Sequence, residues 1–453
     1  MSVRWISRHG YVLAAASVMP LLVWWLGWYP GFASSDSIDQ LGQIESGVIF
    51  NFHPAVHTLY MGAVSLGGNQ PGLITLVQIL ALAGLLVYGA KWLTKAGVPT
   101  WLAVGIAWAL GLSPAIAPTT LALWKDVPFG LFLLWAWIEL LALAVDRNRL
   151  QRMAPILRLG LSLAGIWVFR GNGPLTVLPV IAMLLWIGRH HLKQPIYVVG
   201  VMTATLIIVI GPLYTLADVR RSSIEPAQVF LPDVAASFAN DPGSFTSADL
   251  KLIEAVAPIS IWTSRYDCFD STPLLFDPEF DQRPVTQDPS SYRSLELAVL
   301  TRDFGSVISH RLCAANFIYS PPQPENAFFH RPPYSIPPNT LGLQREPLVG
   351  LAFEVTDGFW RWAEIEGRLW FTWRPAILII PALVSVLLFL ARPASRRFLI
   401  PSTLFVAHVA NVMVMSPAQE FRYAYPLYLL APMTLTLLWP TFSRSLRPRA
   451  LRG

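Results

Sequence analysis

The chain has 453 residues, of which 54% are hydrophobic and only 13% are charged, about half the charged fraction of a soluble globular domain. These proportions argue against a soluble enzyme and exclude intrinsic disorder and a collagen-like chain, because so few charges cannot cover so much apolar surface. The net charge of +6 would suit a nucleic-acid-binding protein. However, the basic residues are placed as on the inner face of a membrane protein, so no nucleic-acid partner is expected.

Apolar stretches close to the length of a membrane-spanning helix recur along the chain. There are ten of them, at 11–29, 72–92, 100–116, 127–145, 155–169, 174–188, 195–213, 375–391, 398–415 and 424–440. The fifth and sixth are short and form, in an alternative interpretation, a re-entrant hairpin. The first resembles a signal peptide, but it is long and rich in tryptophan, so we interpret it as an anchor. The sequence therefore predicts an α-helical polytopic membrane protein with about ten transmembrane helices.

Lys and Arg residues collect in alternate segments between these stretches. The short loops on one side carry Lys125, Arg170 and Arg422. The segments on the other side carry seventeen basic residues: Arg4, Arg8, Lys91, Lys95, Arg147, Arg149, Arg152, Arg158, Arg189, Lys193, Arg392, Arg396, Arg397, Arg444, Arg447, Arg449 and Arg452. Because basic loops remain in the cytoplasm, we expect both termini to be cytoplasmic, in a plasma membrane of the bacterial inner-membrane type.

Two long segments fall on the outer side. Residues 30–71 contain no Lys or Arg and form the first outer loop of a transmembrane core that covers 1–213. Residues 214–370, rich in Pro, Asp and Ser, are too long for a simple loop and predict a mostly helical or irregular extracytoplasmic domain. The last part, 371–453, is predicted to hold C-terminal helices and a basic tail. Cys268 and Cys313 both lie in the outer domain, which favours a disulfide, with two buried thiols as the alternative.

Polar residues gather at five span ends on the outer side, and the first group follows span 11–29. A serine can cap a short helix in which Asp36, Gln40 and Gln43 share one face. In the first turn of that helix the Asp36 carboxylate stays ionised and is available to accept a proton. It is therefore a candidate general base, and a second capping residue is the alternative. Asp39 points to another side and is expected to be solvated.

His53 and His57 stand four residues apart in the same loop. Together with Asp36 they could bind a divalent metal from one helical turn. Because the spacing fixes no third strong ligand, we favour an interfacial helix whose histidines hydrogen-bond to neighbours or lipid headgroups.

Lys125 and Asp126 stand at the outer end of span 127–145. Pro128 starts that helix and leaves its N-terminal amides free to attract an anion. Lys125 is thus a candidate phosphate ligand, and Asp126 either holds it or binds a sugar hydroxyl. The alternative is that both residues anchor the span at the interface.

Two further outer turns each carry one arginine. Arg170 and Asn172 lie in an Arg-Gly-Asn-Gly-Pro turn between apolar runs, and Arg422 and Tyr423 follow Glu420. Arginine suits a bidentate phosphate contact, and tyrosine suits stacking on a sugar ring. Each arginine has a structural alternative as an ion pair, for example Arg422 with Glu420.

Glu139 is an acid in the middle of a predicted span. Such a residue is a functional candidate, yet its spacing names no partner. His408 and Asn411 are also polar and intramembrane in the prediction, so they are possible partners, and the role of Glu139 stays open.

These motifs occur in a recognisable order: Asp36 in a Tyr-Pro-Gly…Ser-Asp-Ser setting, a His-Pro helix, Trp-Lys-Asp, Arg-Gly-Asn-Gly-Pro and a late Arg-Tyr…Tyr-Pro. The order resembles that of the C-type (GT-C) membrane glycosyltransferases over about 20–213 and 375–440. The family usually carries an acidic pair in the first outer loop, whereas this chain has Asp36-Ser-Ile-Asp39, which leaves a metal requirement open.

The resemblance implies inverting transfer of a sugar from a polyprenyl-phosphate donor to a cell-envelope glycan, lipid or protein on the extracytoplasmic side. It makes Asp36 the general base, and growing charge on the leaving phosphate would be neutralised by Lys125, Arg170 and Arg422. A polymerase or ligase of lipid-linked glycans is the nearest alternative. A transporter fits less well because the polar groups gather at one face, and a scaffold or receptor would not need Arg170 beside an opened turn.

Overall fold

The computed structural model describes residues 12, 14–220 and 227–443, and within them it contains helices and isolated bridges but no β-strand. The predicted helical class is confirmed for this part of the chain. The predicted terminal basic residues Arg4, Arg8, Arg444, Arg447, Arg449 and Arg452 lie outside the described residues.

Five helical stretches of the described chain are long and apolar enough to cross a membrane, by length and composition. Two of them are α5 (Pro71–Ala96) and α8 (Asp126–Val145). The third, Lys193–Leu216, contains α11 (Lys193–Ile208) and α12 (Tyr214–Leu216). The fourth, Glu366–Ala391, contains α22 (Leu369–Thr372) and α23 (Ala376–Ala391), and the fifth, Pro393–Met415, contains α24 (Leu399–Met415). Shorter apolar helices include Ala14–Gly27, α6 (Thr100–Gly111), α9 (Met153–Phe169) and α10 (Gly173–Ile187). These helices support an integral membrane protein, and the count of about ten spans stays a prediction.

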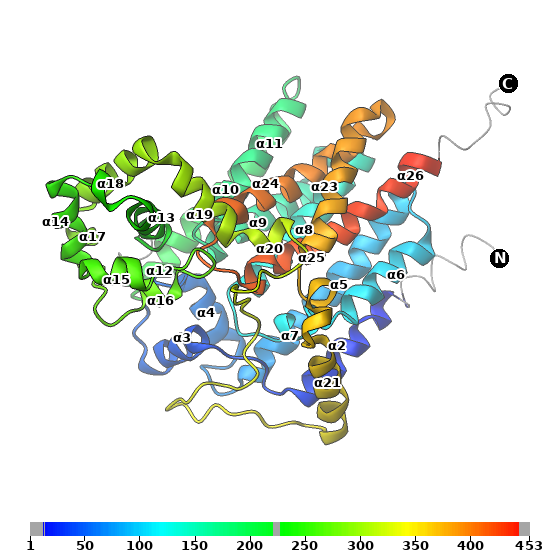
Figure 1. Ribbon diagram of the computed structural model, residues 1–453. Coiled ribbons are helices and arrows are strands. Elements are labelled where there is room, and N and C mark those ends of the chain that lie inside the picture. The colour runs from blue at the N-terminus through cyan, green and yellow to red at the C-terminus, as the bar shows by residue number, and fades with distance from the viewer. Residues whose placement is uncertain (1–11, 13, 221–226, 444–453) are drawn as a thin grey trace, which may run out of the picture.

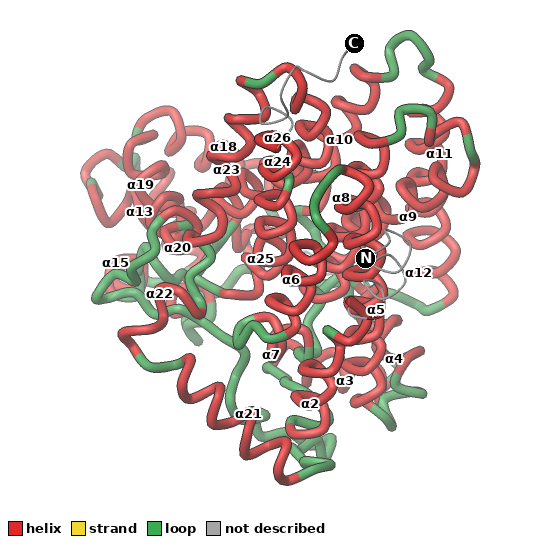
Figure 2. The backbone as a smooth tube through the Cα atoms, turned by 90° about the vertical axis from the view of Figure 1, so that its right-hand side faces the viewer, coloured by secondary structure: helices red, strands yellow, loops and turns green. Residues whose placement is uncertain are grey.

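Helix α8 forms the centre of the bundle, among α5, α9, α24 (Leu399–Met415) and α25 (Phe421–Thr436) (Figure 1). Its sequence is apolar on all faces, and almost all of its residues are buried. A helix of this kind has no face for solvent, so other helices surround it. Figure 2 shows the same bundle from the side. Helix α26 (Leu438–Ser443) contacts α25.

The two ends of the bundle differ in the segments that they carry. The turn from α10 to α11 (Lys193–Ile208) and the turn from α23 (Ala376–Ala391) to α24 lie at the end away from α3 and α4 (Figure 1). These two turns carry five of the basic residues predicted to be cytoplasmic. The first outer loop, with α3 (Ser35–Ser46) and α4 (Ala55–Val64), lies at the opposite end.

Helix α3 begins and ends at identifiable residues. Ser34 is its N-cap, and the Ser34 backbone N–H donates to Ser37 Oγ at 3.1 Å. Ser37 Oγ donates in turn to the Leu123 carbonyl at 2.9 Å, which ties α3 to the segment just before α8. The helix ends at Gly47, whose φ of 69° favours glycine. The first turns of α3 and α8 are therefore held close together.

A second helical unit lies beside the bundle, on the left of Figure 1. It has its own apolar core, centred on residues such as Phe238, Trp262 and Val299. A disulfide joins Cys268 and Cys313. Its helices are α13 (Ala227–Asn240), α14 (Ser247–Val256), α15 (Ile259–Ser264), α16 (Thr272–Leu275), α17 (Arg283–Gln287), α18 (Pro289–Arg302) and α19 (Phe304–Ala314). The next helix, α20 (Asn316–Tyr319), packs on the core of the bundle, against α23.

The rest of the segment predicted as an outer domain packs elsewhere. Residues 321–349 contain neither helix nor strand, and we call 334–349 the strap. The strap leads into α21 (Gly350–Ala363), which packs along α2 (Val18–Gly27). A Cβ atom on Gly27 would lie 2.7 Å from the Phe353 nitrogen, so only glycine allows this approach. The Leu348 N–H donates to the Leu26 carbonyl at 2.8 Å, which ties the end of the strap to α2.

Candidate active site

One small pocket collects residues from four segments far apart in the sequence. It is lined by Asp36 and Gln40 of α3, His53, Trp124 to Asp126 at the start of α8, and Arg422 at the start of α25. Its side chains are closely packed and leave no room for a water molecule. The structure thus brings together Asp36, Gln40, His53, Lys125, Asp126 and Arg422 of the predicted site.

Asp36 and Arg422 form the central ion pair of this pocket. Arg422 Nη1 donates to Asp36 Oδ2 at 2.7 Å, and Arg422 Nη2 donates to Glu420 Oε1 at 3.2 Å. The ion pair with Glu420 that the sequence offered as an alternative is therefore present beside the one with Asp36. Burial by itself would raise the pKa of Asp36, but the charge of Arg422, aided by His53 and Lys125, lowers this pKa to about 2. The carboxylate is ionised at neutral pH.

His53 lies between Asp36 and Lys125. Lys125 Nζ is 3.2 Å from His53 Nδ1, and because an ammonium can only donate, Nδ1 is the acceptor. The proton of the neutral ring is then on Nε2, which is 3.9 Å from Asp36 Oδ1. Burial and the nearby Lys125 charge lower the pKa of His53 to about 4, so the imidazole is neutral at pH 7.

His57 faces away from this group. Its Nδ1 is 2.9 Å from Gln40 Oε1, and Gln40 Nε2 donates to Thr58 Oγ1 at 2.9 Å. The pKa of His57 falls to about 3, mainly because the side chain is completely buried. No group of three or more His, Cys, Asp or Glu that could hold a metal occurs in the part of the chain that the structure describes.

Asp126 and Arg170 form a second ion pair behind the pocket. Arg170 Nη1 donates to Asp126 Oδ1 at 2.5 Å, and both side chains are almost fully buried. The Arg170 guanidinium also lies 4.6 Å from the centre of the Tyr423 ring. Arg170 and Tyr423 therefore lie one layer behind the residues that line the pocket, and they hold Asp126 in place.

Asn172 lies outside the pocket, in a polar cluster between α10 and α24. Its carbonyl accepts from Asn411 Nδ2 at 3.0 Å, and the same nitrogen donates to Thr176 Oγ1 at 2.8 Å. His408 Nδ1 is 3.3 Å from Thr176 Oγ1. The cluster joins two helices, and its Asn172 side chain does not reach Asp36.

Glu139 has partners that the sequence reading did not suggest. Arg149 Nη2 donates to Glu139 Oε2 at 2.8 Å, and Arg158 Nε donates to Glu139 Oε1 at 2.7 Å. Tyr88 OH donates to the same Oε1 at 2.7 Å. His408 and Asn411 are not its partners. Both arginines come from the basic segment after α8. Their place in the sequence indicated the side of the membrane but not that they pair with Glu139.

The segment before Arg422 is positioned by residues that no local pattern indicated. The Gln419 N–H donates to the Phe269 carbonyl at 3.0 Å, and the His330 N–H donates to the Gln419 carbonyl at 2.8 Å. Arg374, fully buried, donates to Gln419 Oε1 at 2.9 Å and to Asn316 Oδ1 at 2.6 Å. Residues 417–421 are thus held between the disulfide-bonded unit and the start of α23. The partners lie tens of residues apart, so sequence spacing carries no signal of them.

No family model matches the chain, and no curated protein matches it. Among solved structures, it is similar to the S. cerevisiae protein O-mannosyltransferase Pmt1-Pmt2 complex bound to the sugar donor. The identity is 17% and the TM-score 0.39, over 50% of this chain and 36% of that chain. The chain therefore spans about a third of that protein, and a likeness at this level does not assign it to a family.

Proposed function

We propose that this protein is a GT-C type membrane glycosyltransferase that moves a sugar from a polyprenyl-phosphate donor to an extracytoplasmic acceptor with inversion. The observation that supports the proposal most is the meeting of Asp36 with Lys125 and Arg422 in one pocket. A carboxylate and two cations, brought from remote parts of the chain, are the groups that deprotonation and phosphate departure require.

In this mechanism Asp36 accepts the proton of the acceptor hydroxyl. The acceptor oxygen forms a bond to the anomeric carbon, while the bond from that carbon to the phosphate oxygen breaks on the opposite face. The bonding electron pair leaves with the phosphate. Lys125 and Arg422 neutralise the charge that grows there.

The pKa of Asp36, about 2, is low for a general base, because the best catalytic pKa lies near the working pH. The Arg422 guanidinium is the strongest cause of this lowering. When Arg422 turns to the donor phosphate, Asp36 loses that partner and its proton affinity rises. Donor binding would thus prepare the base.

Two further residues have supporting roles. His53 Nδ1 accepts from Lys125 and so positions the Lys125 ammonium, while its Nε2 lies 3.9 Å from Asp36, beyond hydrogen-bond distance. Arg170 holds Asp126 and rests on Tyr423, so it acts on the pocket through these neighbours. In this proposal the site lies outside the cytoplasm and both termini lie inside.

The decisive test replaces Asp36 by Asn in the full chain, reconstituted in proteoliposomes with polyprenyl-phosphate-linked monosaccharides and an envelope extract as the acceptor source. Loss of a general base is expected to slow transfer by about 10² to 10⁴-fold. Asp39→Asn is the control: Asp39 lies on the same helix and bonds to Gln43 at 2.7 Å, but does not line the pocket. If Asp36→Asn turned over like Asp39→Asn, the mechanism would be wrong.

A further inference from the structure

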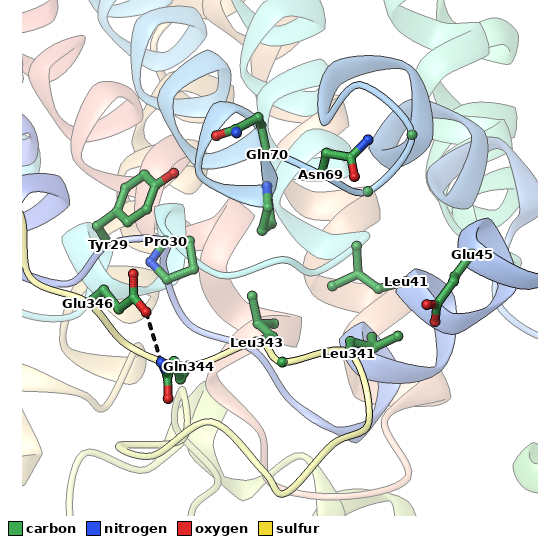
Figure 3. Close-up of a pocket in the computed structure, with 14 residues that line it drawn as sticks. Tyr29, Pro30, Leu41, Glu45, Asn69, Gln70, Leu341, Leu343, Gln344 and Glu346 are labelled. Carbon is green, nitrogen blue, oxygen red and sulfur yellow. Dashed lines mark hydrogen bonds between the residues drawn. The ribbon is translucent and has the colours of Figure 1, made fainter.

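A second, larger cavity lies against α3, with a volume of about 450 Å³, within the range of small-molecule sites. Its walls are the end of α2, α3, the turn from α4 to α5, and the strap. Figure 3 shows Asn69 and Gln70 on one side and Leu341 and Leu343 on the other. Glu45 stands at one end, and Tyr29 with Glu346 at the other. We call it the strap cavity.

The lining of the strap cavity carries groups suited to hydroxyls. Three side-chain amides line it: Asn69, Gln70 and Gln344. Asn69 Nδ2 donates to the Leu66 carbonyl and Gln344 Nε2 to Glu346 Oε1, both at 2.8 Å, so these two amides offer their second N–H and their oxygen. The carboxylates of Glu45 and Glu346 add acceptors. Leucine and proline side chains supply apolar wall between them. This alternation of polar groups and apolar surface matches a sugar ring, whose edges carry hydroxyls and whose faces carry C–H groups.

The charge of the strap cavity differs from that of the candidate active site, whose lining carries two carboxylates, Asp36 and Asp126, and two cations, Lys125 and Arg422. Two carboxylates line the strap cavity, and none of the described residues that line it is a Lys, Arg or His. A phosphate would be repelled here, and it would be attracted by Lys125 and Arg422 at the candidate active site. The two cavities therefore select different parts of a substrate pair.

Both rims of the strap cavity are fixed by hydrogen bonds. In the turn before α5, the Gly67 N–H donates to the Gly62 carbonyl and the Gln70 N–H to the Ser65 carbonyl, both at 2.8 Å. In the strap, Asn339 Oδ1 accepts from the Leu341 and Leu343 backbones at 3.1 and 2.9 Å. A preformed site loses less entropy when it binds a ligand.

Helix α3 is the shared wall of the two cavities. Asp36 and Gln40 line the candidate active site, whereas Leu41 and Glu45 line the strap cavity. Glu45 is nine positions after Asp36, which places their side chains on opposite faces and about 13.5 Å apart along the axis. A ligand of several sugar units would span such a length.

From this chemistry and placement we infer that the strap cavity binds the uncharged glycan portion of the acceptor. The inference rests on the proposed function, which supplies the need for an acceptor, and it narrows the acceptor from a glycan, lipid or protein to a neutral glycan.

The test is direct binding, which needs no turnover. The full chain in nanodiscs is probed by saturation-transfer NMR with maltotetraose, mannotetraose and galactotetraose. At least one probe should bind to wild type, and Asn69→Ala and Gln344→Ala should each weaken it about tenfold, the value of one or two hydrogen bonds. Asp36→Asn, across α3, should bind as wild type does. Glu346→Gln, which keeps the shape of the side chain, is an additional variant of the cavity. Thermal unfolding checks that each variant is folded.

Three results would overturn the inference: no probe binds, the cavity variants bind as wild type does, or tetralysine binds in preference to every sugar. Failure of the proposed function looks different. In that case Asp36→Asn would turn over normally, while the sugar would still bind and would still depend on Asn69 and Gln344.

Discussion

At the scale of single residues, the candidate site is defined by groups that hold one another in a fixed charge state. Asp36 is ionised because Arg422 is beside it, and His53 is neutral because burial and Lys125 oppose its proton. His57, one turn along α4, is neutral because it is fully buried. The neutral state of the two histidines makes the stability of the fold depend on pH.

Both histidines have a pKa below the ordinary 6.5 in the folded protein, about 4 for His53 and about 3 for His57. The unfolded chain therefore binds more protons below pH 6.5, so stability is complete above 6.5 and is lost as the pH falls toward 4. We expect the midpoint of thermal unfolding, followed by tryptophan fluorescence in detergent, to drop over this range. His57→Gln should flatten the drop. A pH profile identical to that of wild type would contradict the assigned cause.

At the scale of elements, the loop before α25 is positioned by a buried arginine. Arg374 bonds to Gln419 and Asn316 with its planar fork of donors, which a lysine cannot reproduce. Arg374→Lys should lower the free energy of unfolding by about 2 kcal/mol, because buried acceptors lose their partners.

The same Arg374→Lys variant should also reduce transfer, since residues 417–421 lead directly to Arg422. Arg361→Lys is the control, because Arg361 is largely exposed and its i, i+4 pair with Asp357 contributes little. Denaturant unfolding and the transfer assay check both effects. Equal behaviour of the two variants would show that Arg374 does not position the loop.

The elements themselves could be predicted where the signal is local. The apolar stretches 127–145 and 398–415 coincide with α8 and α24 within one residue, because apolar length alone selects a membrane helix. The serine cap of α3 could also be predicted from the sequence. The packing of α21 on α2 was not, since it depends on a close approach at Gly27 to a segment more than three hundred residues away.

At the scale of the whole molecule, sidedness explains why several site residues could be anticipated. The charge bias put Asp36, Lys125 and Arg422 on one side, and the structure brings them into one pocket. The charge bias does not show which residues line the pocket. It therefore did not distinguish Arg170, which lies behind the pocket, or Asn172, which lies in another polar cluster. Contacts between remote segments decide that difference.

Sidedness has a direct test, because the two cysteines of the chain are joined in a disulfide. A single cysteine at Asp39 should react with a membrane-impermeant maleimide in intact cells. A cysteine at Arg152, in the basic segment after α8, should react only after the membrane is opened. Labelling of both positions in intact cells would place the predicted inner and outer segments on the same side.

The contact at Gly27 carries one more consequence. A methyl group at this position would act as a wedge between two helices, because it would meet the backbone of Ala352 and Phe353 rather than a side chain that can rotate away. The displaced α21 would pull on the Leu348 tether and so on Glu346, whose N–H donates to the Tyr29 carbonyl at 2.9 Å. The absence of a side chain at Gly27 thus helps to fix the end of the strap, whose residues 341–344 and 346 line the strap cavity.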